Sequence, residues 1–188
     1  MKIFNMMVIL FLVGCSTNRR LDADGLADKK GIFFGKVDIM FNGKQFTENC
    51  SLVFEQEDGE SEYALDESGY ITVKAPMGKI SFKRVICMDD APYVHLFTGA
   101  HFHNYGKMTK TYFGNITITW LADEEKKVSV FQSFFGGGKS VNKDKSDGMA
   151  KMTVKKNIEP VLREFNRMNS SLTNLGTRTV LMKVGKSK

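Results

Sequence analysis

From residue 31 onward, hydrophobic and polar side chains alternate in short runs, which is the pattern of β-strands. The first run covers residues 32–41, where Val37, Ile39 and Phe41 alternate with Lys36, Asp38 and Met40. The pair Asn42-Gly43 follows it and predicts a tight hairpin turn, because both residues accept positive φ. Further strands are expected at residues 50–55, 70–74, 79–88, 93–98, 112–121, 126–135 and 179–184.

Short strands separated by turn residues predict a mainly β protein. We expect an antiparallel β-sandwich of about seven strands over residues 31–135, each sheet having one packed and one solvated face. A turn is expected at residues 75–78, where the chain reads Ala-Pro-Met-Gly. Between Glu55 and Glu67 there are seven acidic residues and no basic one, and we interpret this stretch as a solvated hairpin tip.

One segment near the C-terminal end follows a helical period instead. Its apolar positions are Ile158, Val161, Leu162, Phe165, Met168 and Leu172. Asn157 is the expected N-cap, and Pro160 falls in the first turn, where its missing N–H costs little. This amphipathic helix is expected to pack on the sandwich, with a position on a membrane surface as the alternative. Residues 136–150 are expected to form a Gly/Lys-rich loop, and residues 151–188 the helix and a basic tail.

The first residues have the features of an export signal. The apolar run at residues 3–13 is shorter than the roughly 20 residues that cross a bilayer, and Lys2 precedes it. The stretch Leu12-Val13-Gly14-Cys15 resembles the lipobox of bacterial lipoproteins. That resemblance implies a signal peptide over residues 1–14, cleavage before Cys15, and acylation of Cys15 with fatty acids such as palmitate. An ordinary secretory signal with an incidental cysteine is the alternative.

The same resemblance implies a place in the cell. Two or more acyl chains anchor a protein stably in a membrane, so the expected partner is the bilayer that holds the Cys15 chains. Residues 15–30 are expected to be the lipidated cysteine and a flexible tether. Ser16 stands where many lipoproteins of the inner membrane have aspartate, so we expect the outer membrane, facing the periplasm or the cell surface.

Two further cysteines, Cys50 and Cys87, remain in the exported part of the chain. Thiols outside the inner membrane tend to be oxidised, and an even number favours pairing. We therefore predict a Cys50–Cys87 disulfide, with two separately buried thiols as the alternative.

Two short motifs resemble those of a known group of sandwiches. The stretch at residues 70–80, a strand followed by Pro76-Met77-Gly78 and another strand, resembles transthyretin-like and carboxypeptidase-regulatory-like domains. Residues 112–116, which read Tyr-Phe-Gly-Asn-Ile, are similar to a strand start of small lipoproteins of this form. The resemblance implies a seven-stranded scaffold or binding module, without shared catalytic residues to carry over.

All three histidines lie close together in the sequence, at His95, His101 and His103. On an extended segment His101 and His103 share one face, and both imidazoles could meet one metal ion. His95 has the same parity, although Gly99 interrupts the segment between them. Two solvated loop histidines without a metal are the favoured interpretation.

Charge and the remaining motifs narrow the function. Residues 139–188 hold twelve Lys or Arg and four acidic residues, so this basic segment could bind an envelope protein or an anionic lipid or glycan. The stretch 136–140, Gly-Gly-Gly-Lys-Ser, resembles the end of a phosphate-binding loop but lacks the earlier glycine, because Ser133 stands there. Export makes nucleic acid an unexpected partner.

These observations predict a lipid-anchored bacterial envelope protein that acts as a non-catalytic binding or structural module, without a cofactor. No Gly-x-Ser-x-Gly elbow is present in the sequence, which disfavours a serine hydrolase of that type. The alternative function is a periplasmic metal-binding protein that uses the segment with His101 and His103.

Overall fold

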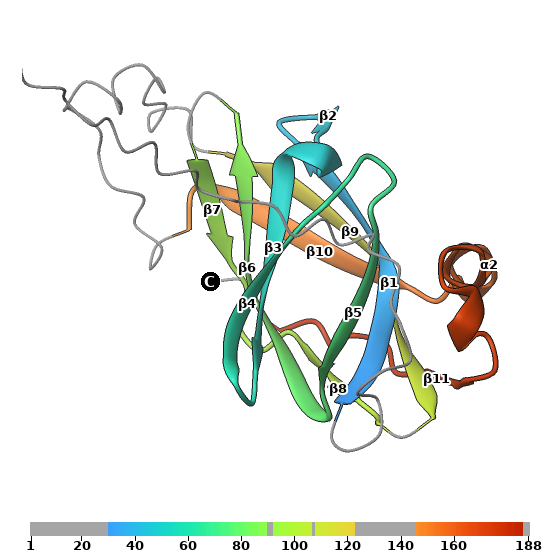
Figure 1. Ribbon diagram of the computed structural model, residues 1–188. Helices are drawn as coiled ribbons and strands as arrows, with labels where there is room; N and C mark the ends of the chain where they lie inside the picture. The colour runs from blue at the N-terminus through green and yellow to red at the C-terminus, as the bar shows by residue number, and fades with distance from the viewer. Residues whose placement is uncertain (1–29, 90–91, 107, 123–145, 186–188) are drawn as a thin grey trace, which may run out of the picture.

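Two β-sheets lie face to face, and one helix packs on the outer side of the larger sheet (Figure 1). The computed structural model describes residues 30–89, 92–106, 108–122 and 146–185. The helix is α2 (Ile158–Met168), and short 3-10 turns occur at Thr47–Asn49 and Ser170–Leu172. The strands are β1 (Lys30–Phe41), β2 (Lys44–Gln45), β3 (Cys50–Gln56), β4 (Gly59–Ala64), β5 (Tyr70–Pro76), β6 (Gly78–Met88), β7 (Pro92–Leu96), β8 (His101–Asn104), β9 (Thr109–Leu121), β10 (Met149–Lys155) and β11 (Gly176–Thr179). The predicted mainly β sandwich with a helix near the C-terminal end is confirmed.

The sheets are more complex than the predicted seven antiparallel strands. The larger sheet has the order β10-β9-β1-β2, with β5 also paired to β1 and β11 to β9; the smaller has the order β4-β3-β6-β7, with β8 also paired to β6. Strand β9 runs parallel to both β1 and β11, so the larger sheet is mixed. The described residues contain eleven strands in all. Alternation predicts which side chains face inward, but it carries no information on the direction of a neighbouring strand from elsewhere in the chain.

The hairpin predicted at Asn42-Gly43 is confirmed. Met40 pairs with Gln45 and Phe41 with Lys44, and the two turn residues have φ values of 47° and 79°. The returning strand β2 is only two residues long, and the chain then crosses to the smaller sheet as β3.

The acidic stretch also forms a hairpin tip, as predicted, but it includes an additional strand. Strands β3 and β4 pair from Ser51–Ala64 to Gln56–Gly59, which leaves Glu57 and Asp58 in the turn. Every second residue of β4 is half-buried and the rest are exposed, so the strand lacks the buried positions by which the others were predicted.

The core between the sheets is rich in aromatic rings. Phe33 on β1 lies within 5.2–5.8 Å of the ring centroids of Phe54, Phe102 and Phe113 in edge-on contacts. Phe113 belongs to the larger sheet, whereas Phe54 and Phe102 belong to the smaller one. Each such contact contributes about 0.5–1.5 kcal/mol beyond the burial of the rings, so this cluster ties the two sheets together.

The predicted disulfide between Cys50 and Cys87 is present. The two cysteines are directly opposite each other on β3 and β6, with a Cα–Cα distance of 4.1 Å. Both side chains face the core, where they are almost completely buried. The alternative of two separately buried thiols is therefore excluded.

Helix α2 packs on the larger sheet, as its apolar pattern predicted. Val161 and Phe165 are buried against Phe34 of β1 and Tyr112 of β9. Asn157 stands at the N-cap position, but its side chain does not cap the helix. Its backbone N–H donates instead to the Tyr112 hydroxyl at 3.1 Å, which connects the start of the helix to the sheet.

Two boundaries of the C-terminal part differ from the prediction. Strand β10 occupies residues 149–155, across the expected border between loop and helical segment. The last strand, β11, ends at Thr179 instead of beginning there. The residues after it remain extended, because the backbone N–H groups of Val180 and Met182 donate to the carbonyls of Tyr112 and Phe113. The strand expected at 126–135 and the stretch 136–140 lie outside the described residues.

Candidate functional site

His101 and His103 lie on strand β8, in agreement with the expectation that their segment is extended. Phe102 between them points into the core, so the two histidines lie on the outer face of the smaller sheet. The His101 Nδ1 atom is 2.8 Å from the Gly99 carbonyl oxygen. Because a carbonyl only accepts, Nδ1 carries the proton and Nε2 of the neutral ring keeps its lone pair. The His103 ring packs on Tyr105 at 4.6 Å.

His95 is not brought together with these two histidines. It lies on β7 with its ring inside the sandwich, 1% exposed, and contacts the rings of Phe97 and Trp120. Neither ring nitrogen has a hydrogen-bond partner among the described residues. Burial lowers the pKa of His95, and the nearby carboxylate of Asp147 opposes that shift. His95 is therefore a core histidine that favours the neutral form.

His95 does not share a face with His101, as the alternation in the sequence suggested, because the two residues lie on separate strands, β7 and β8. After β7 the chain turns through residues 97–100, with Gly99 at φ 78°, and then pairs with another part of β6 as β8. Within the part of the chain that the structure describes, no three His, Cys, Asp or Glu side chains come close enough to hold a metal ion.

A groove lies over the outer face of the smaller sheet. Its volume is about 480 Å³, within the range of about 300–1,000 Å³ that is typical of small-ligand sites. Strands β3, β4 and β6 supply its charged residues, and residues 96–101 form one side of it. The lining residues are Glu55, Glu60, Lys79, Ser81, Phe82, Lys83, Arg84, Leu96, Phe97, Thr98, Gly99, Ala100 and His101.

Two ion pairs cross the groove side of the sheet. The Lys83 ammonium lies 3.3 Å from the Glu55 carboxylate. The Arg84 guanidinium donates to both oxygens of Glu60, at 2.7 and 3.4 Å. A two-point contact of this kind holds both side chains in one plane. The Arg84–Glu60 pair therefore presents fixed donors next to fixed acceptors in the groove.

A β-bulge positions the two cations. The register between β3 and β6 shifts between Val53 and Phe54, so that Val53 pairs with Arg84 and Phe54 with Phe82. Lys83 is the extra residue, and both it and Arg84 are half-buried instead of alternating. The sequence carried this signal: Ile80 and Phe82 point inward in one parity, and Val85 and Cys87 point inward in the other.

The turn at residues 97–100 is held against β6 by its backbone. The Phe97 N–H donates to the Lys83 carbonyl at 2.8 Å, and the Phe82 N–H donates to the Ala100 carbonyl at 2.9 Å. The Phe97 and Phe82 rings stack at 5.0 Å. This side of the groove is therefore formed in advance of any ligand.

Two later segments of the chain form hydrogen bonds with the outer edges of β7 and β8. The Asp147 carboxylate and the Ser146 hydroxyl accept hydrogen bonds from the N–H groups of Val94 and Leu96, which covers the outer edge of β7. Lys183 exchanges backbone hydrogen bonds with His101 on β8. The outer edges of β7 and β8 beside the groove thus already have partners.

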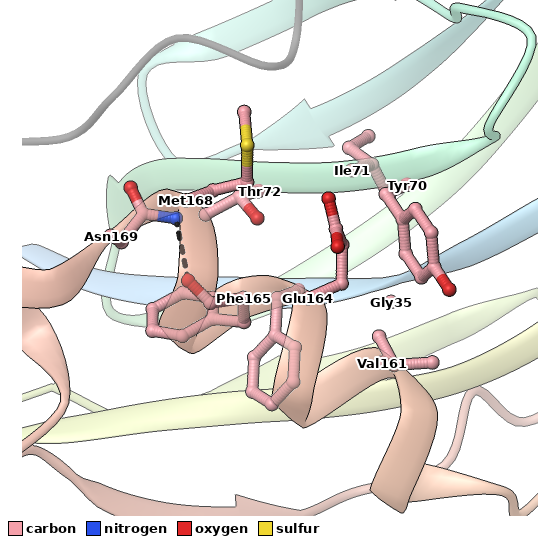
Figure 2. A pocket seen from close by; sticks show the side chains of 10 residues that line it. Gly35, Tyr70, Ile71, Thr72, Val161, Glu164, Phe165, Met168 and Asn169 are labelled. Carbon is pink, nitrogen blue, oxygen red and sulfur yellow. Dashed lines mark hydrogen bonds between the residues drawn. The ribbon is translucent and has the colours of Figure 1, made fainter.

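A second hollow lies between α2 and the larger sheet (Figure 2). Val161, Glu164 and Phe165 of the helix face Tyr70 and Thr72 of β5 there. Its volume is about 10 Å³, room for no more than one water molecule. It is a gap in the packing of helix on sheet and offers no space for a larger ligand.

The basic segment predicted at 139–188 is spread over several elements where it is described. Lys151 and Lys155 lie on β10, and Arg178 on β11 stacks over the Tyr105 ring at 4.7 Å. Arg167 on α2 is paired with Glu164. Residues 139–145 and 186–188 lie outside the described part.

The predicted lipid anchor at Cys15 and the tether to residue 29 also lie outside the described residues. Among the residues that are described, no helix combines the length and the apolar character needed to cross a bilayer. No protein-family model, curated protein or solved structure matches this chain.

Proposed function

We propose that this chain is a lipid-anchored bacterial envelope protein whose β-sandwich is a non-catalytic binding module. The resemblance of Leu12-Val13-Gly14-Cys15 to a lipobox supports the anchor. The Cys50–Cys87 disulfide supports an oxidising compartment, because such bonds persist outside the cytoplasm. The resemblance to transthyretin-like sandwiches is in keeping with a scaffold that carries a binding site.

The groove over the smaller sheet is the observation that carries the binding role. It combines fixed charged groups, such as the Arg84–Glu60 pair, with apolar surface from Leu96. Ligand sites usually have this composition of a few oriented polar groups beside apolar side chains. The turn at 97–100 is fixed by backbone hydrogen bonds, so little order has to be gained on binding.

The anchor is tested on the protein expressed with its leader in a bacterial host. Mass spectrometry of the mature amino terminus is expected to find acylated Cys15, and an alkyne-labelled palmitate analogue is expected to label the protein. The Cys15→Ser variant is expected to lose the label. An unprocessed leader, or a mature terminus at another residue, contradicts the anchor.

The groove is tested separately by photo-crosslinking in intact cells. A photoreactive amino acid at Ser81, which lines the groove, is expected to give a discrete adduct. The same amino acid at Thr119, exposed on β9 of the other sheet, serves as the matched control and is expected to give none. Equal adducts at both positions, or none at Ser81, contradict the role of the groove.

Metal binding by His101 and His103 is the second candidate. It is favoured by the hydrogen bond of His101 Nδ1, which leaves Nε2 as the atom that could ligate a metal. Zinc titration of the mature protein, followed by histidine NMR, tests it. Loss of the shifts in His101→Gln supports the site, and spectra that zinc leaves unchanged contradict it.

A further inference from the structure

We infer that the ligand of the groove is an acidic saccharide, a hydroxylated ring that carries a carboxylate. The inference rests on the proposed role of the groove as the ligand site and adds the chemical class of the ligand. Three properties of the lining carry it: one cation in excess, donors and acceptors in adjacent pairs, and an apolar side formed by Leu96.

The cation in excess is Lys79. Lys83 and Arg84 are neutralised by Glu55 and Glu60, whereas Lys79 forms no ion pair with any residue that the structure describes. Lys79 is exposed and lines the same groove. An anionic group on the ligand would balance this excess of positive charge.

Adjacent donors and acceptors suit hydroxyl groups. A hydroxyl donates one hydrogen bond and accepts others, so it can contact a carboxylate and a guanidinium at the same time. The Glu60–Arg84 and Glu55–Lys83 pairs offer this arrangement at two places. His101 Nε2 adds an acceptor close to the apolar side of the groove.

A peptide suits the groove less well. Peptides that lie along a sheet bind by adding a strand to a free edge. Beside the groove, the backbone groups of Phe97 and Ala100 already bond to β6, and those of His101 bond to Lys183. On this side of the groove a ligand has to be recognised by side chains, which is how a compact ring with hydroxyls is bound.

The test uses the mature acylated protein in detergent micelles and two probes, trigalacturonate and its methyl ester. The ester keeps the rings and removes the charges. Calorimetry is expected to show binding of the acid at least tenfold tighter than of the ester, and weaker binding of the acid at 0.5 M salt. Lys79→Ala is expected to weaken the acid at least fivefold, while Lys151→Ala, which removes an exposed lysine from the other sheet, leaves it unchanged.

Equal affinity for acid and ester, or equal effects of Lys79→Ala and Lys151→Ala, overturns the inference. So does binding of an acidic peptide such as tetraglutamate in the absence of saccharide binding. If neither saccharide binds but the Ser81 photo-crosslink still forms, the ligand class is wrong and the groove keeps its proposed role. If both experiments fail, the proposed role of the groove fails as well.

Discussion

The rings of His95 and Phe97 meet edge-on, with centroids 4.9 Å apart, so that a buried histidine stands directly behind one side of the groove. Since burial lowers the pKa of His95, the unfolded chain takes up a proton near pH 6.5 while the folded chain still resists it. The free energy of unfolding is therefore expected to fall as the pH drops from about 6.5 through the lower pKa of the folded state.

The variant His95→Gln is expected to remove this part of the pH dependence. Denaturant unfolding at pH 5, 6, 7 and 8 measures it, and His103→Gln is the control because His103 is exposed on the outer face. The control is expected to keep the fall in stability below pH 6.5. A His95→Gln protein whose stability follows the same pH curve as the wild type contradicts the assignment.

The Cys50–Cys87 bond closes a loop with a sequence separation of 37. The chain-entropy model gives a stabilisation of about 3–4 kcal/mol for a loop of this length. The Cys50→Ala/Cys87→Ala double variant is expected to lose about that amount of unfolding free energy, as measured with denaturant. Wild-type protein in reducing buffer is the control and is expected to move to nearly the same midpoint. A loss below about 1 kcal/mol would mean that the bond contributes little through the unfolded chain.

Residues with strict alternation were the predictable part of the fold. Val37, Ile39 and Phe41 all face the core, and Asn42-Gly43 forms the expected turn, because both features depend only on local geometry. The parallel pairing of β1 with β9 could not be predicted, since it depends on which distant strand meets β1. Strand β4 was missed for another reason, namely that its side chains are mostly exposed.

The candidate site was harder to predict because irregular pairing creates it. Lys83 and Arg84 lie together only because of the bulge, and the histidine pattern overlooked that a turn separates His95 from His101. The sequence does contain a signal for the bulge: along β6 the inward-facing residues change from even to odd positions. It marks the one position where β6 turns two consecutive cations toward the same face.

Lys110 connects the last helix to the sheet from a buried position. Its ammonium donates to the Asn166 side chain at 3.1 Å and to the carbonyls of Leu172 and Thr173 at 3.4 and 3.2 Å. Lys110→Met leaves these acceptors without their donor, and we expect it to lower the free energy of unfolding by about 1–3 kcal/mol. Lys151→Met, an exposed change on β10, is the control and is expected to have little effect.

The stability of the same two variants is also expected to differ in its dependence on alkaline pH. Burial lowers the pKa of Lys110, so the folded chain releases its proton at a lower pH than the unfolded chain does. Stability from this group therefore rises as the pH increases from the folded pKa toward 10.5. Lys110→Met is expected to lack that rise and Lys151→Met to keep it. Identical alkaline curves for the two variants would contradict the lowered pKa of the buried Lys110.

Gly114 allows β9 to direct side chains to the core on one face of the sheet and to α2 on the other. It has φ 120°, and the register between β1 and β9 shifts beside it, so that Tyr112 faces α2 while Phe113 and Ile116 face the core. A Cβ at this position would lie 2.7 Å from the Val154 side chain. Gly114→Ala is therefore expected to cost about 1–3 kcal/mol in strain, with a further loss from the displaced Val154.

The matched control is Gly176→Ala on β11, where φ is ordinary and a Cβ would meet nothing closer than 3.5 Å. It is expected to change the unfolding midpoint little, whereas Gly114→Ala lowers it. Hydrogen exchange distinguishes the cause: loss of the bulge is expected to expose the amides at the end of β10 and at the start of α2 together, because Lys155 of β10 pairs with Asn115 and the Asn157 N–H bonds to Tyr112, on either side of Gly114. Equal stability of the two variants would mean that β9 can form the bulge at position 114 without a residue of positive φ.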